Sequence, residues 1–133
     1  MNKHLLVTGG AGFIGRWLVA RLLNDGHNVL AIDNFFNSSP ENIKEFQNHP
    51  CFEFMEGDIQ DESFLSSVFS RPLDYCYHLA ASIIVQESID DPKTTFNNDV
   101  LGTFNVLEQC RATDTPMLFM STCMVFDKAG MDK

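Results

Sequence analysis

Basic residues are scarce in this sequence. Nine Lys and Arg residues stand against 18 Asp and Glu residues, and the formal net charge is −9. Because this charge repels a phosphate backbone, we expect no nucleic acid partner. It does not exclude a smaller nucleotide ligand, because a helix N-terminus and backbone amides bind phosphate without any basic side chain.

Paired cysteines and long hydrophobic runs are also lacking. The four cysteines, Cys51, Cys76, Cys110 and Cys123, form no C-x-x-C pair and have no His at zinc-finger spacing. We therefore expect no metal site and reduced, mostly buried thiols. The apolar run directly before Thr8 is only three residues long, too short for a signal peptide or a membrane span. These features predict a cytoplasmic protein without membrane contact.

Apolar segments of strand length alternate with longer segments of helical period. This alternation predicts an α/β fold, a doubly wound parallel sheet with crossover helices. Strands are expected over residues 4–8, 28–33, 51–55, 74–79 and 117–121. Helices are expected over residues 13–23, 40–48, 61–70 and 92–111. The strand order should be 3-2-1-4-5, with the sheet truncated after about five strands.

The first helix has an apolar stripe at spacings of one, three and four residues. Such spacing predicts a single apolar face packed on the core. The stripe comprises Phe13, Ile14, Trp17, Leu18, Leu22 and Leu23.

A glycine-rich turn connects the first strand to this helix. Gly9, Gly12 and Gly15 stand where a dinucleotide-binding fingerprint must lie. We expect Gly9 to permit the tight turn, Gly12 to let a pyrophosphate approach backbone amides, and Gly15 to let helix and strand pack closely. A merely flexible turn is the alternative for three glycines taken alone.

Asp33 ends the second strand, 18 residues after Gly15. A carboxylate at this place accepts hydrogen bonds from both hydroxyls of an adenosine ribose. A 2′-phosphate would lie against this charge, and the nearest following cation is Lys44, so NAD is favoured over NADP. The alternative, an ordinary turn residue at a strand end, leaves the glycine-rich turn unexplained. The predicted fold is therefore of the Rossmann type.

Five motifs in register extend this pattern through the chain: residues 8–15, Asp33 with Asn34, residues 57–59, residues 78–81, and Ser121 with Thr122. With them the sequence resembles the extended short-chain dehydrogenases, and more narrowly the NAD-dependent epimerase/dehydratase family. The resemblance implies NAD as cofactor and a nucleotide sugar as substrate. It places the cofactor on Gly9, Gly12, Phe13, Ile14, Gly15, Asp33, Asn34, Asp58, Ile59, Leu79, Ala80, Ala81 and Asn98.

Two positions within these motifs have alternative interpretations. The family usually has an Asn that braces the site where this chain has Asp99, with Asn98 just before it. A solvated helix face is the alternative for this segment. His78 is expected to be a hydrogen-bonded, partly buried strand residue rather than a base or a metal ligand.

The family's acid/base pair does not occur in these 133 residues. The resemblance implies a Ser or Thr, a Tyr, and a Lys four residues after the Tyr. Thr122 matches the first position, but neither Tyr75 nor Tyr77 is followed by Lys at that spacing. Related dehydratases carry Asp-Glu where this chain has Cys123 and Met124, which disfavours dehydration. Phe126 and Asp127 also depart from the common family residues, Tyr and Gly.

Residues 1–133 are therefore expected to form an NAD(P)-binding domain that lacks the substrate-binding C-terminal region and is inactive alone. The alternatives are a non-catalytic NAD-binding or scaffold module and a reductase of a non-sugar substrate. The resemblance further implies a homodimer through the helix at 92–111. The apolar face of that helix should be exposed in a single copy, at Phe96, Val100, Phe104 and Leu107.

Overall fold

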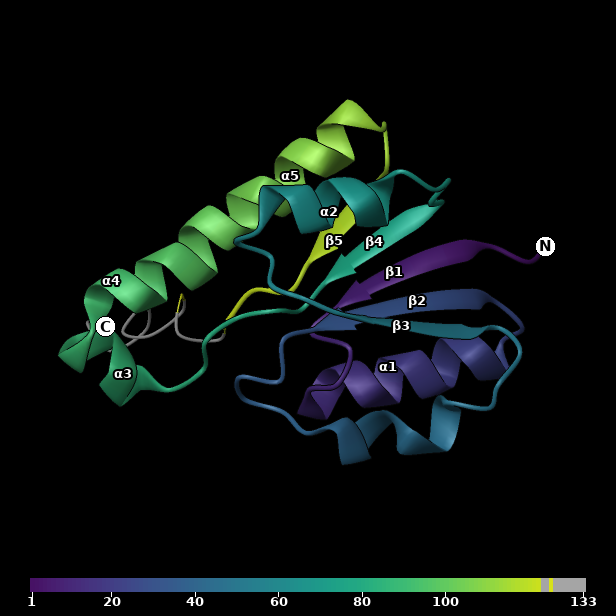
Figure 1. The fold of residues 1–133 in the computed structure, drawn as a ribbon, viewed down its shortest axis with the longest axis horizontal. Helices are drawn as coiled ribbons and strands as arrows, with labels where there is room; N and C mark the ends of the chain where they lie inside the picture. Colours follow the sequence, from purple (N-terminus) through teal and green to yellow (C-terminus); the bar gives the residue numbers. More distant parts are fainter. Residues whose placement is uncertain (123–124, 126–133) are drawn as a thin grey trace, which may run out of the picture.

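A computed structural model describes residues 1–122 and 125 of the chain. Its centre is a five-stranded sheet in the order β3-β2-β1-β4-β5, in which every pairing is parallel. The strands are β1 (His4–Thr8), β2 (Asn28–Asp33), β3 (Phe52–Glu56), β4 (Tyr75–His78) and β5 (Met117–Phe119). The α/β class and the strand order predicted from the sequence are confirmed (Figure 1).

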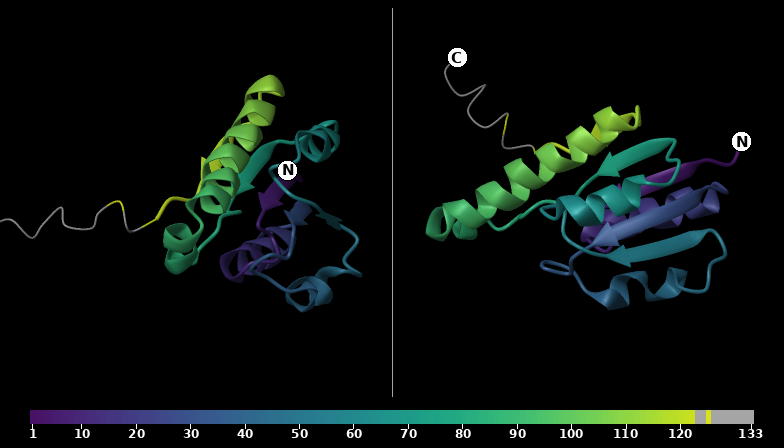
Figure 2. Two further views of the ribbon diagram at one scale, coloured as in Figure 1. Left: turned by 60° about the vertical axis from the view of Figure 1, so that its left-hand side comes forward. Right: turned by 45° about the horizontal axis from the view of Figure 1, so that its top comes forward.

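Helices cover both faces of the sheet. Helix α1 (Phe13–Asn24) and a 3₁₀ helix (Pro40–Phe46) lie on one face, and α2 (Glu62–Phe69) and α5 (Gly102–Ala112) lie on the other (Figures 1 and 2). Because both faces are covered, β1 and β2 are continuous apolar runs rather than alternating ones.

Neighbouring residues of one strand therefore enter two separate cores. Leu5 and Val7 of β1 pack with α1 and the 3₁₀ helix, whereas Leu6 packs with α2 and α5. Side chains of a strand point alternately to opposite faces, so the two cores share the same central strand.

The face that α1 buries differs from the sequence prediction. The buried residues are Gly15, Val19, Leu22 and Leu23, whereas Phe13, Ile14 and Trp17 are 82%, 54% and 61% exposed. The reason is that Gly15 packs against the glycine-rich turn and turns the preceding apolar residues away from the sheet. Leu18 is partly buried beside the core.

The helix predicted at 92–111 is built from three consecutive parts. Helix α4 (Pro92–Thr95) runs into a π-helical segment (Phe96–Leu101), which continues as α5. Together they form one long rod that projects past the sheet (Figure 1). A further helix, α3 (Val85–Asp90), was not predicted and packs near α4. The other helices and strands lie within a few residues of their predicted bounds.

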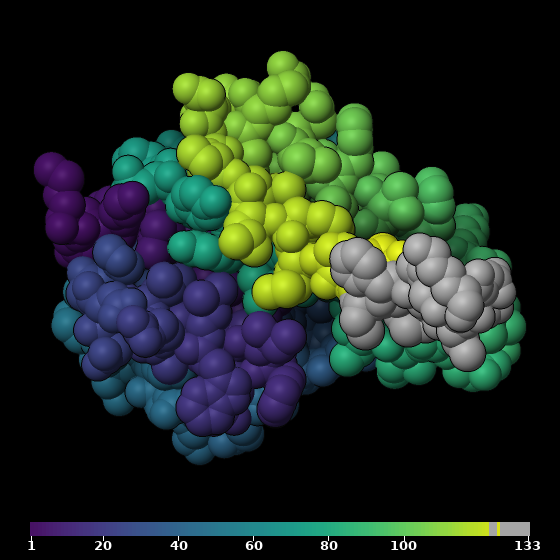
Figure 3. All heavy atoms as spheres, turned by 180° about the vertical axis from the view of Figure 1, so that it is seen from behind, coloured from purple at the N-terminus to yellow at the C-terminus, as the bar shows by residue number. Residues whose placement is uncertain are grey.

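Apolar side chains remain exposed at one edge of the sheet and on the rod. Seen from behind, the residues of β5 reach the surface beside α5 (Figure 3), and Leu118 and Phe119 are 40% and 55% exposed. Phe96, Val100, Phe104 and Leu107 are exposed as predicted.

Two further findings concern the described part of the chain. Cys76 and Cys110 are buried thiols and Cys51 is half-buried, while Cys123 lies outside the described residues. Among the helices that the structure describes, none has the length and apolar character needed to cross a bilayer.

Candidate functional site

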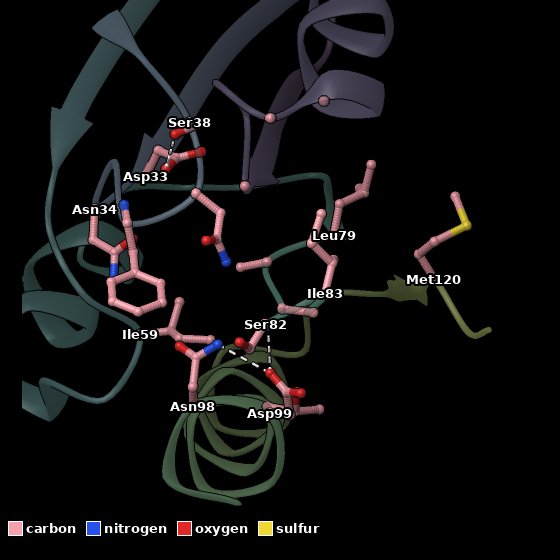
Figure 4. Close-up of a pocket in the computed structure, with 18 of the residues that line it drawn as sticks. Asp33, Asn34, Ser38, Ile59, Leu79, Ser82, Ile83, Asn98, Asp99 and Met120 are labelled. Carbon is pink, nitrogen blue, oxygen red and sulfur yellow. Dashed lines mark hydrogen bonds between the residues drawn. The ribbon is translucent and has the colours of Figure 1, made fainter. Parts of the chain in front are cut away.

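A cleft of about 740 Å³ opens at the carboxyl ends of the strands. Ligands of doubly wound folds bind at this edge, where the strand order reverses on either side of β1. With the exception of Asp58, every residue that the sequence predicted for binding or catalysis lines the cleft: Gly9, Gly12, Phe13, Ile14, Gly15, Asp33, Asn34, Ile59, Leu79, Ala80, Ala81, Asn98 and Thr122. The structure therefore brings residues from all five motifs to one place (Figure 4).

The glycine-rich turn has three positions that admit no side chain, Gly9, Gly10 and Gly15. Gly9 has a φ of +69°, and a Cβ there would lie 2.8 Å from the backbone nitrogen of Ala80. A Cβ on Gly15 would overlap the carbonyl oxygen of Gly9. Gly15 thus packs against the turn itself, which brings the start of α1 close to β1 and β4.

The N-terminus of α1 faces the cleft without a capping side chain. Its N-cap is Gly12, which makes no side-chain hydrogen bond, and the first turn contains no acidic residue. The first amides of a helix have no intrahelical acceptor and carry a partial positive charge. This end of α1 can therefore bind an anionic group without Lys or Arg.

Asp33 joins two loops at the end of β2. Its Oδ2 accepts a hydrogen bond from the N–H of Ala11 at 3.0 Å. Its Oδ1 accepts from the N–H of Phe35 at 2.9 Å and from the hydroxyl of Ser38 at 2.8 Å (Figure 4). An ionised carboxylate offers about four acceptor positions, so one on Oδ2 remains for a ligand hydroxyl. A second ligand hydroxyl would have to replace Ser38.

Asp58 does not line the cleft. Its Oδ2 accepts a hydrogen bond from Asn34 Nδ2 at 3.1 Å, and its Oδ1 accepts from the N–H of Gln60 at 2.8 Å. Asp58 therefore contacts the cleft residue Asn34 without lining the cleft itself. The neighbouring residue Ile59 is buried and does line the cleft.

The position of Ile59 is fixed by α5. A Cβ on Gly102 would lie 2.6 Å from Ile59 Cδ1, so glycine is needed for this contact. Asn105 is buried and its Nδ2 donates to the carbonyl oxygens of Ile59 and Gln60 at 3.2 and 3.4 Å. Helix α5 thus holds the loop that follows β3.

His78 lies at the end of β4 and is fully buried, as a hydrogen-bonded strand residue. Its Nδ1 is 2.6 Å from the hydroxyl of Thr8, and its Nε2 is 2.9 Å from the hydroxyl of Thr103. Burial lowers the pKa of His78 to about 4, so the ring is neutral near pH 7. This pKa and the two hydroxyl contacts indicate a neutral bridge between β1 and α5.

Asp99 braces the loop after β4 from the π-helical segment. Its Oδ1 accepts hydrogen bonds from the N–H of Ser82 at 2.6 Å and from Asn98 Nδ2 at 2.9 Å (Figure 4). Of the two interpretations of this segment, the structure supports the brace rather than a solvated face. π-Helical turns occur frequently at functional sites.

Sequence reasoning missed several cleft residues. Ser38, Ser82, Thr103, Phe119, Met120 and the apolar run Ile83, Ile84 and Val85 all line the cleft. The apolar run was a usable signal, because three exposed aliphatic residues rarely follow one another in a loop. The two serines and Thr103 carried no such signal.

The predicted catalytic position is only partly described. Thr122 is exposed and lines the cleft. Tyr75 and Tyr77 pack against the core beside α1, with ring centroids 5.0 Å apart, and do not line the cleft. Cys123, Met124, Phe126 and Asp127 lie outside the described residues.

A doubly wound parallel sheet whose glycine-rich turn and strand-end carboxylate share one cleft defines a dinucleotide-binding domain of the Rossmann type. Sequence comparison identifies it more closely. The family described as GDP-mannose 4,6 dehydratase matches residues 6–132, and the chain belongs to this family. The resemblance to NAD-dependent epimerases and dehydratases is thereby confirmed.

Individual relatives agree with this family. The chain is 41% identical, over 106 residues, to a UDP-glucose 4-epimerase of Mycolicibacterium smegmatis, an alignment that covers 80% of this chain and 34% of the relative. The solved structure of Pal from Bacillus thuringiensis is 55% identical with a TM-score of 0.90, over 94% of this chain and 41% of that one. A UDP-glucose 4-epimerase from Bifidobacterium longum, solved with NAD+ and UDP, is 32% identical with a TM-score of 0.85, over 93% and 38%.

The chain thus spans about a third of the length of the curated relative and about two fifths of the solved ones. The matched part contains the glycine-rich turn, Asp33 and the cleft residues after β4.

Proposed function

We propose that this chain is the NAD-binding part of an oxidoreductase that acts on nucleotide sugars, of the epimerase or dehydratase type. The observation that carries the proposal is the position of Asp33 in the same cleft as the N-terminus of α1. A carboxylate suits ribose hydroxyls and the helix N-terminus suits a pyrophosphate, so the two features fit the two polar parts of one dinucleotide.

The choice of NAD rather than NADP rests on charge. A 2′-phosphate on the adenosine ribose would approach the carboxylate of Asp33, and Lys44, the predicted nearest following cation, is paired with Glu41 at 3.3 Å. The epimerase of Bifidobacterium longum was solved with NAD+. This relative supports the same cofactor here.

The nucleotide sugar is proposed from the relatives, whose names include UDP-glucose. NAD, when bound, supplies a hydride acceptor for a sugar carbon. Thr122 would orient the sugar hydroxyl at the mouth of the cleft. A hydroxyl of Thr is too weak a base near pH 7 to remove the proton that must leave with the hydride. Neither Tyr75 nor Tyr77 can do so, because both lie outside the cleft.

Isothermal titration of the 133-residue chain with NAD and with NADP tests the cofactor. We expect NAD to bind and NADP to bind at least 10-fold more weakly, because charge repulsion at Asp33 acts on the 2′-phosphate alone. Equal or tighter binding of NADP would overturn the assignment of Asp33. Absence of binding by either nucleotide would overturn the proposed function as a whole.

We further propose a cytoplasmic protein that pairs with a second copy through the rod at 92–112. The pairing is supported by four apolar side chains that lie exposed on consecutive turns of the rod. The exposed fractions of Phe96, Val100, Phe104 and Leu107 are 57%, 52%, 56% and 45%. Sedimentation at increasing concentration should show a dimer. Phe104→Glu should shift it towards monomer, whereas Glu108→Gln, on the same helix but outside this apolar set, should not.

A further inference from the structure

The hydroxyl of Thr8 has all three of its hydrogen-bonding positions in use. The N–H of Ala80 donates to Thr8 Oγ1 at 3.2 Å, and the N–H of Leu79 is shared between Thr8 Oγ1 and the carbonyl oxygen of Thr8, each at 3.2 Å. A threonine hydroxyl has two acceptor positions and one proton. The two amides fill the acceptor positions, so the third contact, to His78 at 2.6 Å, uses the hydroxyl proton of Thr8.

This assignment fixes the proton on the His78 ring. Since Thr8 donates to Nδ1, that nitrogen carries no proton. A neutral imidazole then carries its proton on Nε2. The Nε2–H of His78 donates to Thr103 Oγ1, which lies 2.9 Å away. The opposite tautomer would leave the buried hydroxyl proton of Thr8 without an acceptor, at a substantial cost in a site that water does not reach.

The hydroxyl of Thr103 therefore accepts from His78 and keeps its own proton. Thr103 lines the cleft, and within the described residues its hydroxyl forms one hydrogen bond, the one to His78. A hydroxyl that accepts one hydrogen bond becomes a better donor for the next, because chains of hydrogen bonds polarise one another. The proton of Thr103 is thus available to an acceptor in the cleft.

The position of Thr103 in the cleft indicates which part of the ligand lies next to it. Asp33 stands at the end of β2, on one side of β1, and Thr103 is held by His78 at the end of β4, on the other side. A dinucleotide with its adenosine ribose on Asp33 and its pyrophosphate at α1 has its second nucleoside on the β4 side.

We propose that Thr103 is a ligand-binding residue whose hydroxyl donates a hydrogen bond to an acceptor oxygen in the nicotinamide-riboside half of the bound dinucleotide. This inference rests on the proposed function, because it assumes that NAD occupies the cleft. The hydrogen bonds from Thr8 through His78 to Thr103 fix the position of each proton, so Thr103 presents its hydroxyl proton to the cleft.

The binding test compares two ligands on three forms of the chain. NAD carries the second nucleoside, whereas ADP carries only the adenosine and the phosphates. Wild type, Thr103→Val and Thr103→Ser are titrated with both. We expect Thr103→Val to weaken NAD by about 3- to 10-fold, the loss of one neutral hydrogen bond, and to leave ADP within about twofold. Thr103→Ser keeps the hydroxyl and should bind both ligands as wild type does.

The outcomes separate the inference from the function on which it rests. Equal weakening of NAD and ADP by Thr103→Val would show that Thr103 has only a structural role, and an unchanged NAD affinity would show no contact. Both results would overturn the inference alone. If wild type binds neither ligand, the proposed function fails and the inference with it.

The proton direction has a test that needs no ligand. A long-range ¹H–¹⁵N spectrum of the histidine rings distinguishes a protonated Nε2 from a protonated Nδ1. We expect His78 to have its proton on Nε2 at pH 7. A proton on Nδ1 would reverse the direction of both hydrogen bonds of His78. Thr103 would then donate to His78, and the inference would be overturned.

Discussion

The backbone N–H of Ala11 donates to the carboxylate of Asp33 at 3.0 Å, which joins the glycine-rich turn to the end of β2. The group proposed to bind ribose therefore also positions the turn proposed to bind phosphate. Hydrogen bonds to an ionised carboxylate are stronger than those between neutral groups. In the proposed complex, one side chain would therefore couple adenosine recognition to pyrophosphate recognition.

Replacing Asp33 should affect cofactor affinity more than a surface carboxylate does. We expect Asp33→Ala to weaken NAD by about 1–3 kcal/mol, because charged-group hydrogen bonds are lost at the ribose and at Ala11. Asp25→Ala is the control, since Asp25 pairs with Arg21 on the far end of α1 and does not line the cleft. Calorimetry with NAD measures both; equal effects of the two variants would contradict the role of Asp33.

Gly15 and Gly26 should respond differently to substitution by alanine. Gly15→Ala is expected to lower the free energy of unfolding by about 3 kcal/mol and to abolish measurable NAD binding, because the new Cβ overlaps Gly9. Gly26→Ala should cost about 1 kcal/mol through its φ of +83° alone, since open space surrounds it. Urea unfolding and NAD titration separate the two effects. Retained NAD affinity in Gly15→Ala would show that the turn tolerates displacement.

His78 should make the stability depend on pH between about 6.5 and 4. Its folded pKa of about 4 lies below the ordinary value of 6.5, so the unfolded chain takes up the proton first as the pH falls. The contribution is fully present above pH 6.5 and is lost progressively towards pH 4, by about 3 kcal/mol in all. Urea unfolding at several pH values measures the slope.

The variant His78→Asn serves as the reference for that slope. It has no titratable group at this position, so its stability should vary less over the same pH window than that of wild type. The carboxyls of Asp61, Asp91 and Glu108 have pKa values lowered by hydrogen bonds from Ser63, Thr94 and Arg111, and they are present in both proteins, so their effect cancels in the comparison. Parallel slopes for wild type and His78→Asn would show that His78 does not control this effect.

Asp99 should determine how rigidly the loop after β4 is held. In Asp99→Ala the N–H of Ser82 loses its acceptor, and we expect its hydrogen exchange to be about 10-fold faster. Asp99→Asn retains a carbonyl oxygen and should exchange at nearly the wild-type rate. The exposed residue Asp90, which accepts from Gln86 on α3, provides a control in Asp90→Ala. An unchanged Ser82 exchange rate in Asp99→Ala would refute the brace.

The positions of the helices and strands were easier to predict from the sequence than the faces that they bury. Most bounds follow from alternating apolar segments, which record local periodicity, and the strand order follows from the doubly wound fold type. The buried face of α1 follows only in part. Leu22 and Leu23 enter the core as predicted, whereas Gly15 packs on the turn and the first two residues of the stripe, Phe13 and Ile14, line the cleft. Periodicity shows that a face is apolar but not which surface covers it.

Residues of the candidate site were predictable from the sequence where only one residue type can fill the proposed role. Gly9, Gly15 and Asp33 were found because backbone approach and ribose binding demand those residues. The hydrogen-bonded chain from Thr8 to Thr103 joins residues 95 positions apart, and threonine at either place carries no distinctive sequence signal. Asp58 was placed on the ligand by family position. In the structure it accepts a hydrogen bond from Asn34, and its contact with the ligand stays a prediction.

The central place of β1 in the sheet also sets an order of events during folding. β1 is synthesised before both of its neighbours in the sheet, and one of its edges pairs with β2 at residues 28–32. Its other edge is paired only by residues 75–78 of β4. Until those residues have left the ribosome, the apolar run of Leu5, Leu6 and Val7 presents an open edge to other chains. The nascent chain is therefore most prone to aggregate between the synthesis of β2 and that of β4.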